Sequence, residues 1–365
     1  MKIKTITCHH VYNHGAYLQA YALIAYLNSI GHDAEIINYR PKYLRGHFNL
    51  WHIEDRYKKI GLGWLYLMAK LPERLFALKR KKAFDTFYNK YIQTTPTEYH
   101  SIEELKAYPP IADCYIAGSD QIWNTTFKNG TDPGFYLDFG DKSVKRISYA
   151  ASFATDNLAD GTIQFVKEKL NNFDKISVRE SSGLKILNSL GASGEQVVDP
   201  VFLLPQEWWN KLASNDGINE NYILIYDFEN NPEIKTIAKK LSRHRNLKIY
   251  SIGSKKLKYA NKNYINYDPT TFVGLIKNAK YIISNSFHGS AFALIFKKDF
   301  FVVNRIDGLN VRMRDLLTKY DLQSRIVSPN ITSDMLSVPI NYTQVSSLIN
   351  HDIVKSKDFL NKTLI

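Results

Sequence analysis

The chain has only two cysteines among 365 residues, and they do not form a Cys-x-x-Cys pattern. This scarcity argues against a disulfide framework and against a structural zinc site. Cys8 and Cys114 each stand at the end of an apolar, strand-like run, where a free cysteine usually packs as a small hydrophobic side chain. We therefore predict neither a metal nor another cofactor.

Long apolar runs are also missing. No window approaches the ~18 continuous apolar residues that a membrane-spanning helix needs. Residues 1–7 alternate between apolar and polar and lead into a polar loop, which indicates a first strand and not a cleavable signal. No recognisable nucleic-acid-binding module accompanies the charge of the chain. These absences predict a cytoplasmic protein that does not bind nucleic acid.

What the chain does have suits a packed globular protein of two domains. Hydrophobic residues make up 44% of the sequence and aromatic residues 13%, and the length allows two cores of ordinary size. The formal net charge of +13 indicates anionic partners, although it does not choose between nucleic acid, lipid head groups and phosphorylated metabolites.

Much of the positive charge lies in one amphipathic stretch over residues 62–87 and just beyond it. Its apolar side chains recur at mostly helical spacing. A helix of this kind can lie on an anionic membrane surface, whereas a solvated face packed on its own domain explains the pattern equally well. The basic residues are Lys70, Arg74, Lys79, Arg80, Lys81, Lys82 and Lys90, opposed only by Glu73 and Asp85.

Short apolar runs alternate with helical patterns in both halves, which is the rhythm of a parallel sheet. Residues 51–91 interrupt this rhythm with a helical, basic excursion. The expected strands are Ile3–Thr7, Asp33–Tyr39, Cys114–Ala117, Arg146–Ala150, Lys175–Val178, Tyr222–Asp227, Lys248–Ile252, Tyr264–Asn266, Tyr281–Ser284 and Phe300–Val303. The expected helices are Ala16–Ile30, Pro232–His244, Pro269–Asn278 and Ala291–Phe296.

The pattern breaks at Asp199-Pro200 and Pro205, which places a domain boundary near residues 204–209. We therefore predict an α/β fold of two Rossmann-like, doubly wound domains, residues 1–204 and 205–330, that face each other across a cleft. Residues 331–365 are expected to form a C-terminal tail or helix. The helical pattern over Tyr342–Lys357 fits a return onto the first domain and fits a dimer contact equally well.

Polar motifs follow several of the expected strands, where such folds bind ligands. They are Asn13-His14-Gly15, Gly118-Ser119-Asp120, Arg179-Glu180 and Ser286-Phe287-His288-Gly289. In the last motif a strand runs into a turn and then a helix, so backbone N–H groups and the positive helix end can hold a phosphate or carboxylate. His288 would stand beside that anion as a proton donor. The alternative is a helix capped by Asn285 or Ser286 with His288 satisfied in the turn.

These motifs, with Gln19–Leu23 and Val197–Leu204, occur in the order seen in one family. The chain resembles the polysaccharide pyruvyl transferases from Tyr12 to about Arg325. The resemblance implies a GT-B-like arrangement, with the acceptor on the first domain and the donor on the second. It also implies transfer of the pyruvyl group of phosphoenolpyruvate onto two hydroxyls of a sugar in a surface-polysaccharide precursor, with release of phosphate and formation of a cyclic ketal.

This chemistry requires a general acid, a base and fixed cations. The resemblance makes His288 the general acid. Arg179 is the candidate for the donor phosphate or carboxylate, although a salt bridge to Glu180 is an alternative. Asp120 either takes a proton from an acceptor hydroxyl or caps a turn. Arg312 and Arg314 either close on the donor anion or belong to a solvated helical face.

The remaining candidates are assigned by side of the cleft. Trp123 offers a flat face for a sugar ring, although an aromatic residue after a turn is more often part of a core. The donor-side candidates are Arg179, Asn285, Ser286, Gly289, Ser290 and Arg312. The acceptor-side candidates are Asn13, His14, Gly15, Gln19, Ser119, Gln121, Trp123 and Asn124.

One position departs from the pattern of the family. Ser286 stands where much of the family has an arginine, so a fixed positive charge is missing there. Backbone donors and the Ser286 hydroxyl can still hold an anion, and Arg305 or Arg312 can supply the charge from nearby.

Two other function classes stay open at this stage. A glycosyltransferase with a nucleotide-sugar donor would share the cleft and the sugar acceptor, although no convincing ribose-binding acid follows the second-domain helix pattern. The second open class is a non-catalytic binding protein of polysaccharide assembly. If the acceptor is linked to a lipid diphosphate, the stretch over residues 62–87 would bring the enzyme to the inner face of the membrane.

Overall fold

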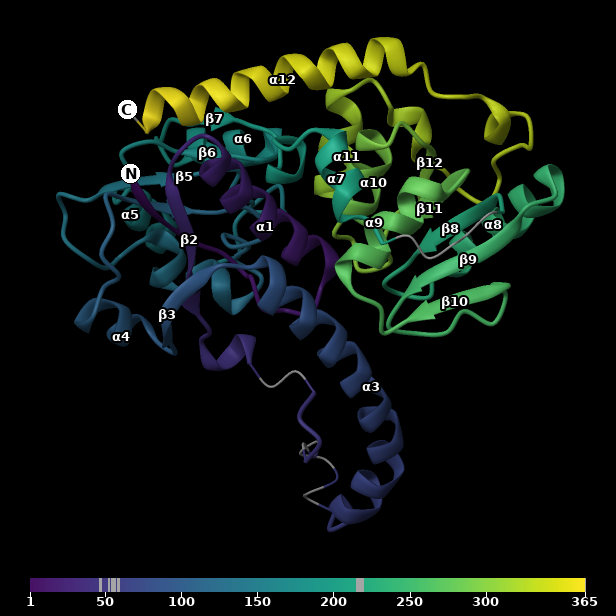
Figure 1. Cartoon of the computed structure of the whole chain (residues 1–365), viewed down its shortest axis with the longest axis horizontal. Helices are drawn as coiled ribbons and strands as arrows, with labels where there is room; N and C mark the ends of the chain where they lie inside the picture. The colour runs from purple at the N-terminus through teal and green to yellow at the C-terminus, as the bar shows by residue number, and fades with distance from the viewer. Residues whose placement is uncertain (46–47, 52, 54–56, 58–59, 215–219, 365) are drawn as a thin grey trace.

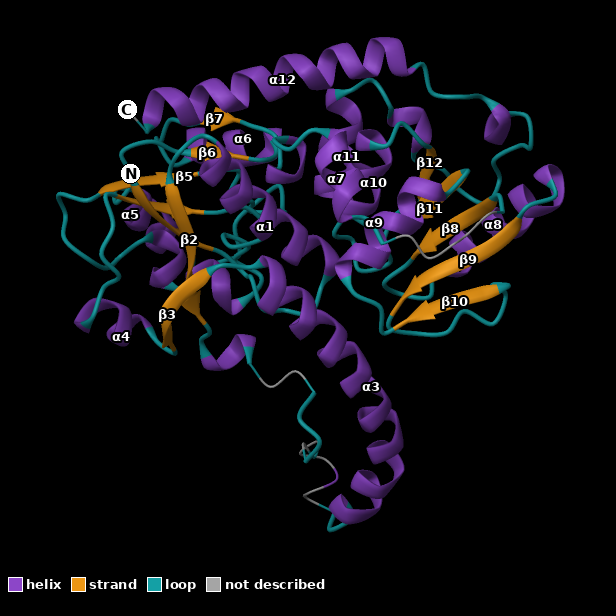
Figure 2. Ribbon diagram, in the orientation of Figure 1, coloured by secondary structure: helices purple, strands orange, loops and turns teal. Residues whose placement is uncertain are grey.

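A computed structural model describes residues 1–45, 48–51, 53, 57, 60–214 and 220–364. Its framework is a pair of five-stranded parallel sheets, which lie in separate halves of the molecule (Figures 1 and 2). The first sheet has the order β3-β2-β1-β4-β5, with β1 Lys2–Ile6, β2 Asp33–Tyr39, β3 Thr94–Tyr99, β4 Cys114–Ala117 and β5 Lys145–Ser148. The second has the order β10-β9-β8-β11-β12, with β8 Tyr222–Tyr226, β9 Lys248–Gly253, β10 Lys262–Ile265, β11 Tyr281–Ser284 and β12 Asp299–Val302.

Both sheets share the Rossmann order, in which the direction of winding reverses next to the first strand. The reversal lies between β1 and β4 in one sheet and between β8 and β11 in the other. The predicted α/β fold with two Rossmann-like units is therefore confirmed. The domain limits at residues 204 and 330 stay a prediction.

Strands buried on both faces formed where the sequence predicted them. Residues 222–226 and 281–284 are fully buried and rich in β-branched and aromatic side chains, as a central parallel strand requires. The edge strand β3 was not predicted, because its sequence is polar and contains Pro96. The strand expected at Lys175–Val178 is reduced to β6 Ser177–Val178, which pairs with β7 Glu195–Gln196.

Helices connect the strands and cover the sheets. They are α1 His14–Ser29, α3 Gly63–Tyr91, α4 Ile102–Ala107, α5 Ile163–Leu170, α6 Ser181–Ser189, α7 Gln206–Leu212, α8 Pro232–Arg245, α9 Pro269–Asn278, α10 Phe287–Ile295, α11 Val311–Lys319 and α12 Tyr342–Thr363. Short 3₁₀ turns occupy Lys42–Leu44, Lys128–Thr131, Pro133–Tyr136, Pro200–Phe202, Gln323–Arg325 and Met335–Ser337.

Helix α3 projects from the body of the molecule (Figure 1). Its buried residues are Phe84, Phe87 and Tyr88, all near its C-terminal end. The helical excursion expected over residues 51–91 thus takes the form of a protruding helix in its described part, whereas residues 52, 54–56, 58 and 59 lie outside the described residues. Among the described helices, none combines the length and the hydropathy needed to cross a lipid bilayer.

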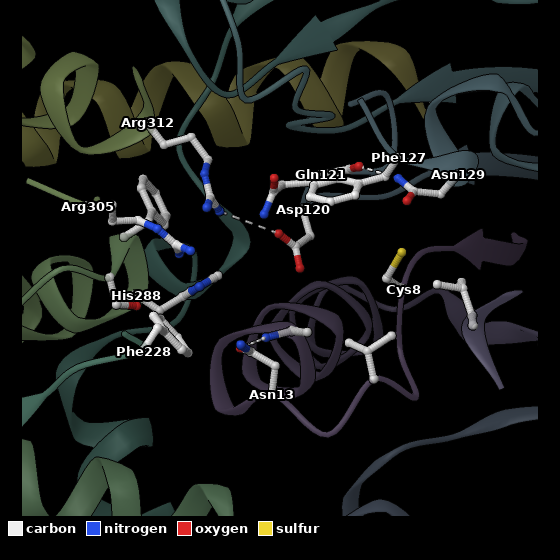
Figure 3. Close-up of a pocket in the computed structure, with 15 residues that line it drawn as sticks. Cys8, Asn13, Asp120, Gln121, Phe127, Asn129, Phe228, His288, Arg305 and Arg312 are labelled. Atoms are coloured by element: carbon white, nitrogen blue, oxygen red, sulfur yellow. Dashed lines mark hydrogen bonds and ion pairs between the residues drawn. The ribbon is translucent and has the colours of Figure 1, made fainter. Parts of the chain in front are cut away.

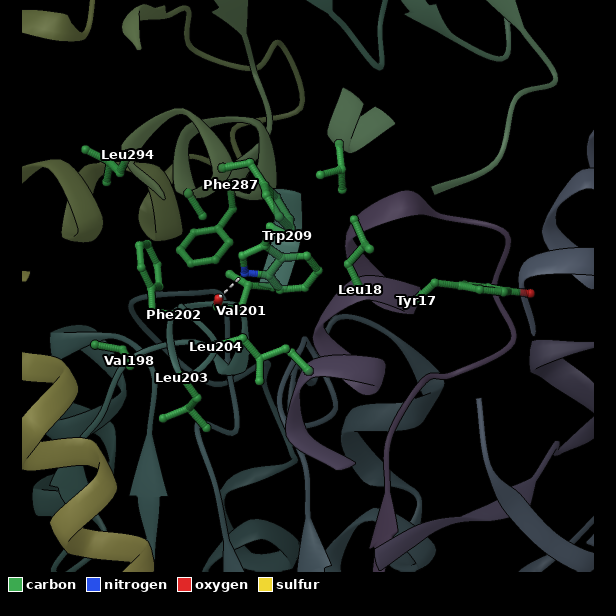
Figure 4. Close-up of a cluster of buried hydrophobic side chains, with 14 of the residues drawn as sticks. Tyr17, Leu18, Val198, Val201, Phe202, Leu203, Leu204, Trp209, Phe287 and Leu294 are labelled. Atoms are coloured by element: carbon green, nitrogen blue, oxygen red, sulfur yellow. Dashed lines mark hydrogen bonds between the residues drawn. The ribbon is translucent and has the colours of Figure 1, made fainter. Parts of the chain in front are cut away.

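One apolar cluster joins the two halves (Figure 4). Trp209 of α7 lies at its centre, fully buried, with Nε1 donating to the Val201 carbonyl oxygen at 3.0 Å. From the first half, Leu18 of α1 packs into this cluster, and from the second half Phe287 and Leu294 of α10 do so. The halves therefore share a core and do not meet only through polar surfaces.

The C-terminal helix α12 lies along both halves (Figure 1). Its Ser356 Oγ accepts the Val198 N–H at 2.9 Å, and the Thr363 carbonyl oxygen accepts Lys145 Nζ at 2.8 Å. On the side of the second half, Asp352 forms an ion pair with Lys319 of α11 at 2.9 Å.

Candidate active site

A pocket of about 340 Å³ lies between the two halves, at the carboxyl ends of their strands (Figure 3). It is built at both points of strand-order reversal, because its walls come from the loops after β1, β4, β8 and β11. Ligands of doubly wound folds bind at such points. The lining residues are Cys8, Val11, Asn13, Ala16, Leu44, Asp120, Gln121, Phe127, Asn129, Phe228, Ser286, Phe287, His288, Arg305 and Arg312.

Two helices point their N-terminal ends at this pocket. Asn13 caps α1, since its side-chain oxygen accepts the N–H groups of Gly15 at 2.9 Å and Ala16 at 3.3 Å. Ser286 caps α10 by accepting the Gly289 N–H at 3.4 Å. Both caps line the pocket, so the positive ends of the two helix dipoles favour an anion there.

His288 lies in the first turn of α10 and against the first turn of α1. A Cβ atom added at Gly15 would come within 2.0 Å of Nδ1 of the imidazole. Only glycine therefore lets helix α1 approach the ring this closely. The predicted motifs around Gly15 and His288 come from different halves of the chain, and the structure brings them into contact.

Behind His288 lies a buried carboxylate that was not among the predicted site residues, Asp199. Its Oδ2 lies 3.6 Å from Nε2 of His288, which is too long for a well-formed hydrogen bond but close enough for a strong charge interaction. Nε2 has no hydrogen-bond partner among the described residues. The signal for Asp199 was present in the Val197–Leu204 motif, which contributed to the family resemblance and to the predicted domain boundary but was given no role in the site.

Asp199 is held by a buried network. It accepts Arg179 Nη1 at 2.6 Å, Ser119 Oγ at 3.3 Å and the Val201 N–H at 3.1 Å. Arg179 also donates to Glu180 at 2.8 Å and lies over the Phe287 ring, 4.2 Å from its centre. Burial alone would raise the pKa of Asp199, but His288 and Arg179 outweigh it, so this pKa lies well below the usual range.

The structure does not place Arg179 in the pocket. Its side chain is 2% exposed and pairs with both Glu180 and Asp199, although Nη2 has no partner among the described residues. The alternative of a salt bridge to Glu180 is thus present, but as a buried pair and not as a surface one. Arg179 fixes Asp199, and through it His288.

Two other arginines supply cations to the pocket, Arg305 and Arg312. Arg312 is paired only loosely, with Nη1 3.9 Å from Oδ1 of Asp120, and burial together with Arg179 lowers its pKa to about 10. Arg305 is held by Asp307 and lies 3.7 Å from Glu229. These side chains stand where the sequence comparison suggested compensation for the missing arginine at residue 286.

Arg314 belongs to the outer face of α11. It pairs with Asp156 at 2.6 Å and is half exposed. Arg312 therefore faces the pocket, whereas Arg314 is solvated.

Asp120 lines the pocket in a strained conformation. Its φ of 74° lies in the left-handed region, which a residue with a Cβ atom rarely adopts. Its carbonyl oxygen accepts the N–H groups of Ile122 at 2.8 Å and Ser152 at 3.1 Å, which holds the backbone in place. Strain of this kind is often found at functional sites, where it aims a side chain. Gln121, the next residue, also lines the pocket.

Several predicted acceptor contacts lie in the interior. Trp123 is fully buried, stacks on Tyr136 and donates to the Phe135 carbonyl oxygen, so it is a core residue that presents no face to the pocket. Asn124 is equally buried and orders its own loop by accepting from Thr126.

Three further acceptor-side candidates, Gln19, Ser119 and His14, do not line the pocket but contact residues around it. Gln19 is buried and donates to Thr7 Oγ1, while Ser119 holds Asp199. His14 contacts the second half, because its ring stacks on Phe272 and lies 3.3 Å from the Tyr226 hydroxyl. Burial holds the pKa of His14 well below its ordinary value, so this imidazole is neutral.

On the donor side, three predicted residues besides Arg179 do not line the pocket. Asn285 is fully buried and joins the loop after β8, where it accepts the Phe228 N–H and donates to Asp227. Gly289 and Ser290 lie in the first turn of α10, and both bond to Ser286. Their role is to shape the turn that carries His288.

Sequence patterns missed the apolar part of the pocket wall. Phe127 and Phe228 line it from opposite halves, and Cys8 lines it from the first half. Burial and the nearby Asp120 raise the pKa of the Cys8 thiol, so it is not a thiolate nucleophile. No sequence signal marked Phe127 or Phe228, because both stand in irregular loops. Among the described residues, no three His, Cys, Asp or Glu side chains are grouped as metal ligands.

The arrangement combines a proton carrier, two cations and a carboxylate around one small volume. His288 can exchange a proton with a bound molecule, Arg305 and Arg312 can hold its anionic groups, and Asp120 can accept a proton from a hydroxyl. Such a site suits addition of a hydroxyl to an anionic, phosphorylated small molecule.

Comparisons with known proteins agree with the fold. The UDP-GlcNAc 2-epimerase from Neisseria meningitidis bound to UDP-GlcNAc is similar over 100% of this chain and 99% of its own, with 10% identity and a TM-score of 0.52. AviGT4, a glycosyltransferase involved in avilamycin A biosynthesis, is similar over 100% of this chain and 97% of its own, with 9% identity and a TM-score of 0.50. The predicted GT-B-like architecture is thereby confirmed, and at these identities the likeness concerns the fold alone. No curated protein matches the sequence. The family model described as polysaccharide pyruvyl transferase matches residues 13–307.

Proposed function

The chain belongs to the polysaccharide pyruvyl transferase family and is a transferase that acts on polysaccharide; we propose that its donor is phosphoenolpyruvate and that it forms a cyclic ketal on two hydroxyls of one sugar. The observation that carries this proposal is His288, backed by Asp199, in a pocket with Arg305 and Arg312. Membership of the family sets aside the alternative of a non-catalytic binding protein.

The donor brings a carboxylate and a phosphate, which need fixed positive partners. Arg305 and Arg312 are the cations among the described residues that line the pocket, and the N-terminal ends of α1 and α10 add backbone donors. This set supports a trianionic donor without the arginine that much of the family has at the position of Ser286.

The first chemical step adds one sugar hydroxyl to C2 of the donor. His288, as imidazolium, gives its proton to the methylene carbon C3, which becomes a methyl group, while the hydroxyl oxygen bonds to C2. The hydroxyl proton passes to Asp120. Asp199 stabilises the imidazolium before the transfer and keeps the ring in place afterwards.

The second step closes the ketal. The C2–O bond to phosphate breaks, phosphate leaves with the bonding electron pair, and the second sugar hydroxyl bonds to C2. Asp120 gives its proton to the leaving phosphate, and the proton of the second hydroxyl returns to His288, so that two hydroxyls and phosphoenolpyruvate yield one ketal and one phosphate and both side chains regain their starting state. Arg305 and Arg312 stabilise the charge that develops on the leaving phosphate.

The acceptor is proposed to be a sugar linked to a lipid diphosphate. Next to the active-site pocket lies a second pocket of about 410 Å³, and Leu44 lines both. Its wall includes Arg40, Arg45 and Lys81 against Asp85 alone, which suits a diphosphate. Replacing Arg45 with Gln should raise KM for a lipid-diphosphate acceptor and leave KM for phosphoenolpyruvate unchanged. An unchanged KM for that acceptor would contradict the proposed linkage.

The direct test of the reaction is phosphate release from phosphoenolpyruvate in the presence of lipid-linked oligosaccharide precursors. His288→Ala should abolish phosphate release without unfolding the protein, whereas His351→Ala, an exposed histidine on α12, should keep the wild-type rate. Mass spectrometry of the acceptor should show the added pyruvyl ketal. Full activity of His288→Ala would refute the role of this residue, and release of phosphate without ketal would refute the reaction.

A further inference from the structure

Helix α3 exposes an apolar face that the described part of the chain leaves open to solvent. At 100° per residue, Trp64, Leu65, Met68, Leu75 and Phe76 fall on one side of the helix. Their exposed fractions run from 46% for Leu65 to 67% for Met68. Trp51, Ile60 and Leu62, which lie close by in sequence, are exposed as well. This is a concentration of large apolar side chains that a soluble monomer rarely leaves on its surface.

The same face continues as a row of cations. Lys79, Lys82 and Lys90 follow at the same angular position toward the C-terminal end of α3, and all three are exposed. Lys79 Nζ lies 5.4 Å from the centre of the Phe76 ring, where the apolar part ends. At the same angular spacing the two acidic residues of α3, Glu73 and Asp85, fall outside this face, and they pair with Lys70 and Lys81. The face is therefore apolar at the tip and basic, without an acidic side chain, behind it.

The tip stands away from the catalytic body. From Met68 to Lys81, which lines the basic pocket, the helix rises about 20 Å at 1.5 Å per residue. Among the described residues, Arg74 donates to the Leu50 carbonyl oxygen, Asn266 donates to that of Phe76, and the Tyr57 ring stacks on that of Tyr66. These contacts leave the side chains of Trp64, Leu65 and Met68 exposed.

We propose that the tip of α3 docks on an anionic phospholipid membrane. Trp64, Leu65 and Met68 would enter the boundary between head groups and acyl chains, where tryptophan is favoured. Lys79 and Lys82 would pair with the anionic head groups, with their carbon stems lying along the interface. The order of these groups along one face matches the order of layers in a membrane surface, which is why lipid and not a protein partner is the proposed occupant. This docking does not depend on which reaction the pocket catalyses.

Flotation with vesicles tests the proposal. The full chain should float with vesicles of phosphatidylglycerol mixed with phosphatidylcholine and bind pure phosphatidylcholine at least about tenfold more weakly. A variant with Trp64→Ser and Met68→Ser should lose at least about tenfold in binding to the anionic vesicles. A variant with Lys79→Gln and Lys82→Gln should also bind more weakly and depend less on salt. Circular dichroism should show each variant folded, since all four side chains are exposed.

The matched control is a variant with Tyr108→Ser and Ile111→Ser, which removes two apolar side chains that are 77% and 83% exposed far from α3 in sequence. It should float like the wild type. The proposal is overturned if the wild type does not bind anionic vesicles, or if the tip variant binds as well as the control. It is also overturned if sedimentation velocity without lipid shows a dimer that the tip variant dissolves, because the face is then a contact between two copies of the chain.

Discussion

At the scale of single residues, the contact between Gly15 and His288 links the two halves at the reacting position. Gly15 has no side chain, so the imidazole of His288 can lie against its backbone. A methyl group at Gly15 would overlap the imidazole, whose Nδ1 would be 2.0 Å away. The position of the general acid thus depends on a residue that carries no chemistry itself.

Gly15→Ala should therefore lower kcat by about 100-fold, because the ring must move by roughly an ångström to relieve the overlap. Steady-state kinetics with phosphoenolpyruvate measures this loss. Gly253→Ala is the matched control, since a Cβ there meets nothing within 4 Å, and it should behave as the wild type. Wild-type kcat in Gly15→Ala would show that His288 acts from another position.

Asp199→Asn tests the carboxylate behind the imidazole. Without the neighbouring carboxylate the imidazolium loses its charge partner, so kcat should fall while KM for phosphoenolpyruvate stays near the wild-type value. A merely structural role would change kcat and KM together. Removal of one partner from the buried pair should also cost about 3 kcal/mol in the free energy of unfolding, because Arg179 keeps only Glu180.

The pH dependence of stability follows from the lowered pKa of Asp199. In the unfolded chain an aspartate titrates at about 3.9, so the contribution of Asp199 is fully present above that pH. It is lost as the pH falls from about 3.9 toward the lower pKa of the folded state. Urea unfolding should be measured from about pH 6 down to about pH 3. Over this range the free energy of unfolding should fall less steeply in Asp199→Asn than in the wild type. Parallel curves would mean that Asp199 is not ionised in the folded protein.

At the scale of elements, the decisive feature is where α10 begins. Ser286 caps this helix, and the cap directs the first turn and His288 toward the pocket. The sequence predicted a helix from Ala291 only, because residues 285–290 are small or polar apart from Phe287 and lack apolar periodicity. In the structure the side-chain cap and the fully buried first turn outweigh that low periodicity.

Ser286→Ala should destabilise the protein by about 1 kcal/mol through loss of the cap, and Ser286→Thr should restore most of it. Thermal unfolding of the three proteins measures the effect. Because the cap also orients His288, activity should fall in Ser286→Ala and recover in Ser286→Thr. Equal melting temperatures in all three would show that α10 does not depend on this cap.

The same comparison shows what sequence patterns can and cannot give. Central strands such as β8 and β11 were predicted within a residue, since burial on both faces leaves an unbroken apolar run. The motifs that meet at the pocket were found because they follow these strands. The pairing of Asp199 with Arg179 was not predicted, since no pattern states that two residues twenty positions apart pair in the interior. The role of Trp123 was left open, because a buried and an exposed aromatic residue look alike in sequence.

At the scale of the whole molecule, the apolar cluster that both halves share should make them unfold together. Phe272 of α9 stacks on His14 from the first half and packs on Phe292 from the second. Asn13, next to His14, and Phe287 of the shared cluster both line the pocket, so the junction holds the two pocket walls at a fixed spacing. Binding of a small, highly charged donor benefits from such a preformed site.

Phe272→Ala should destabilise the protein by about 3–5 kcal/mol, because it leaves a cavity in the shared core. Urea unfolding followed by tryptophan fluorescence and by circular dichroism should remain a single, coincident transition. Ile163→Ala, at a side chain that is 56% exposed, should change stability by less than about 0.5 kcal/mol. Two separate transitions in the wild type would contradict a shared core.

The most direct test of the central claim is calorimetric titration of the protein with phosphoenolpyruvate, with UDP-GlcNAc as the comparison ligand. The wild type should bind phosphoenolpyruvate with one site per chain, and Arg312→Gln should weaken that binding by at least about tenfold through loss of a charged hydrogen-bond donor. Arg314→Gln, on the solvated face of the same helix, should bind as the wild type does. Binding of UDP-GlcNAc without any binding of phosphoenolpyruvate would contradict the proposed donor.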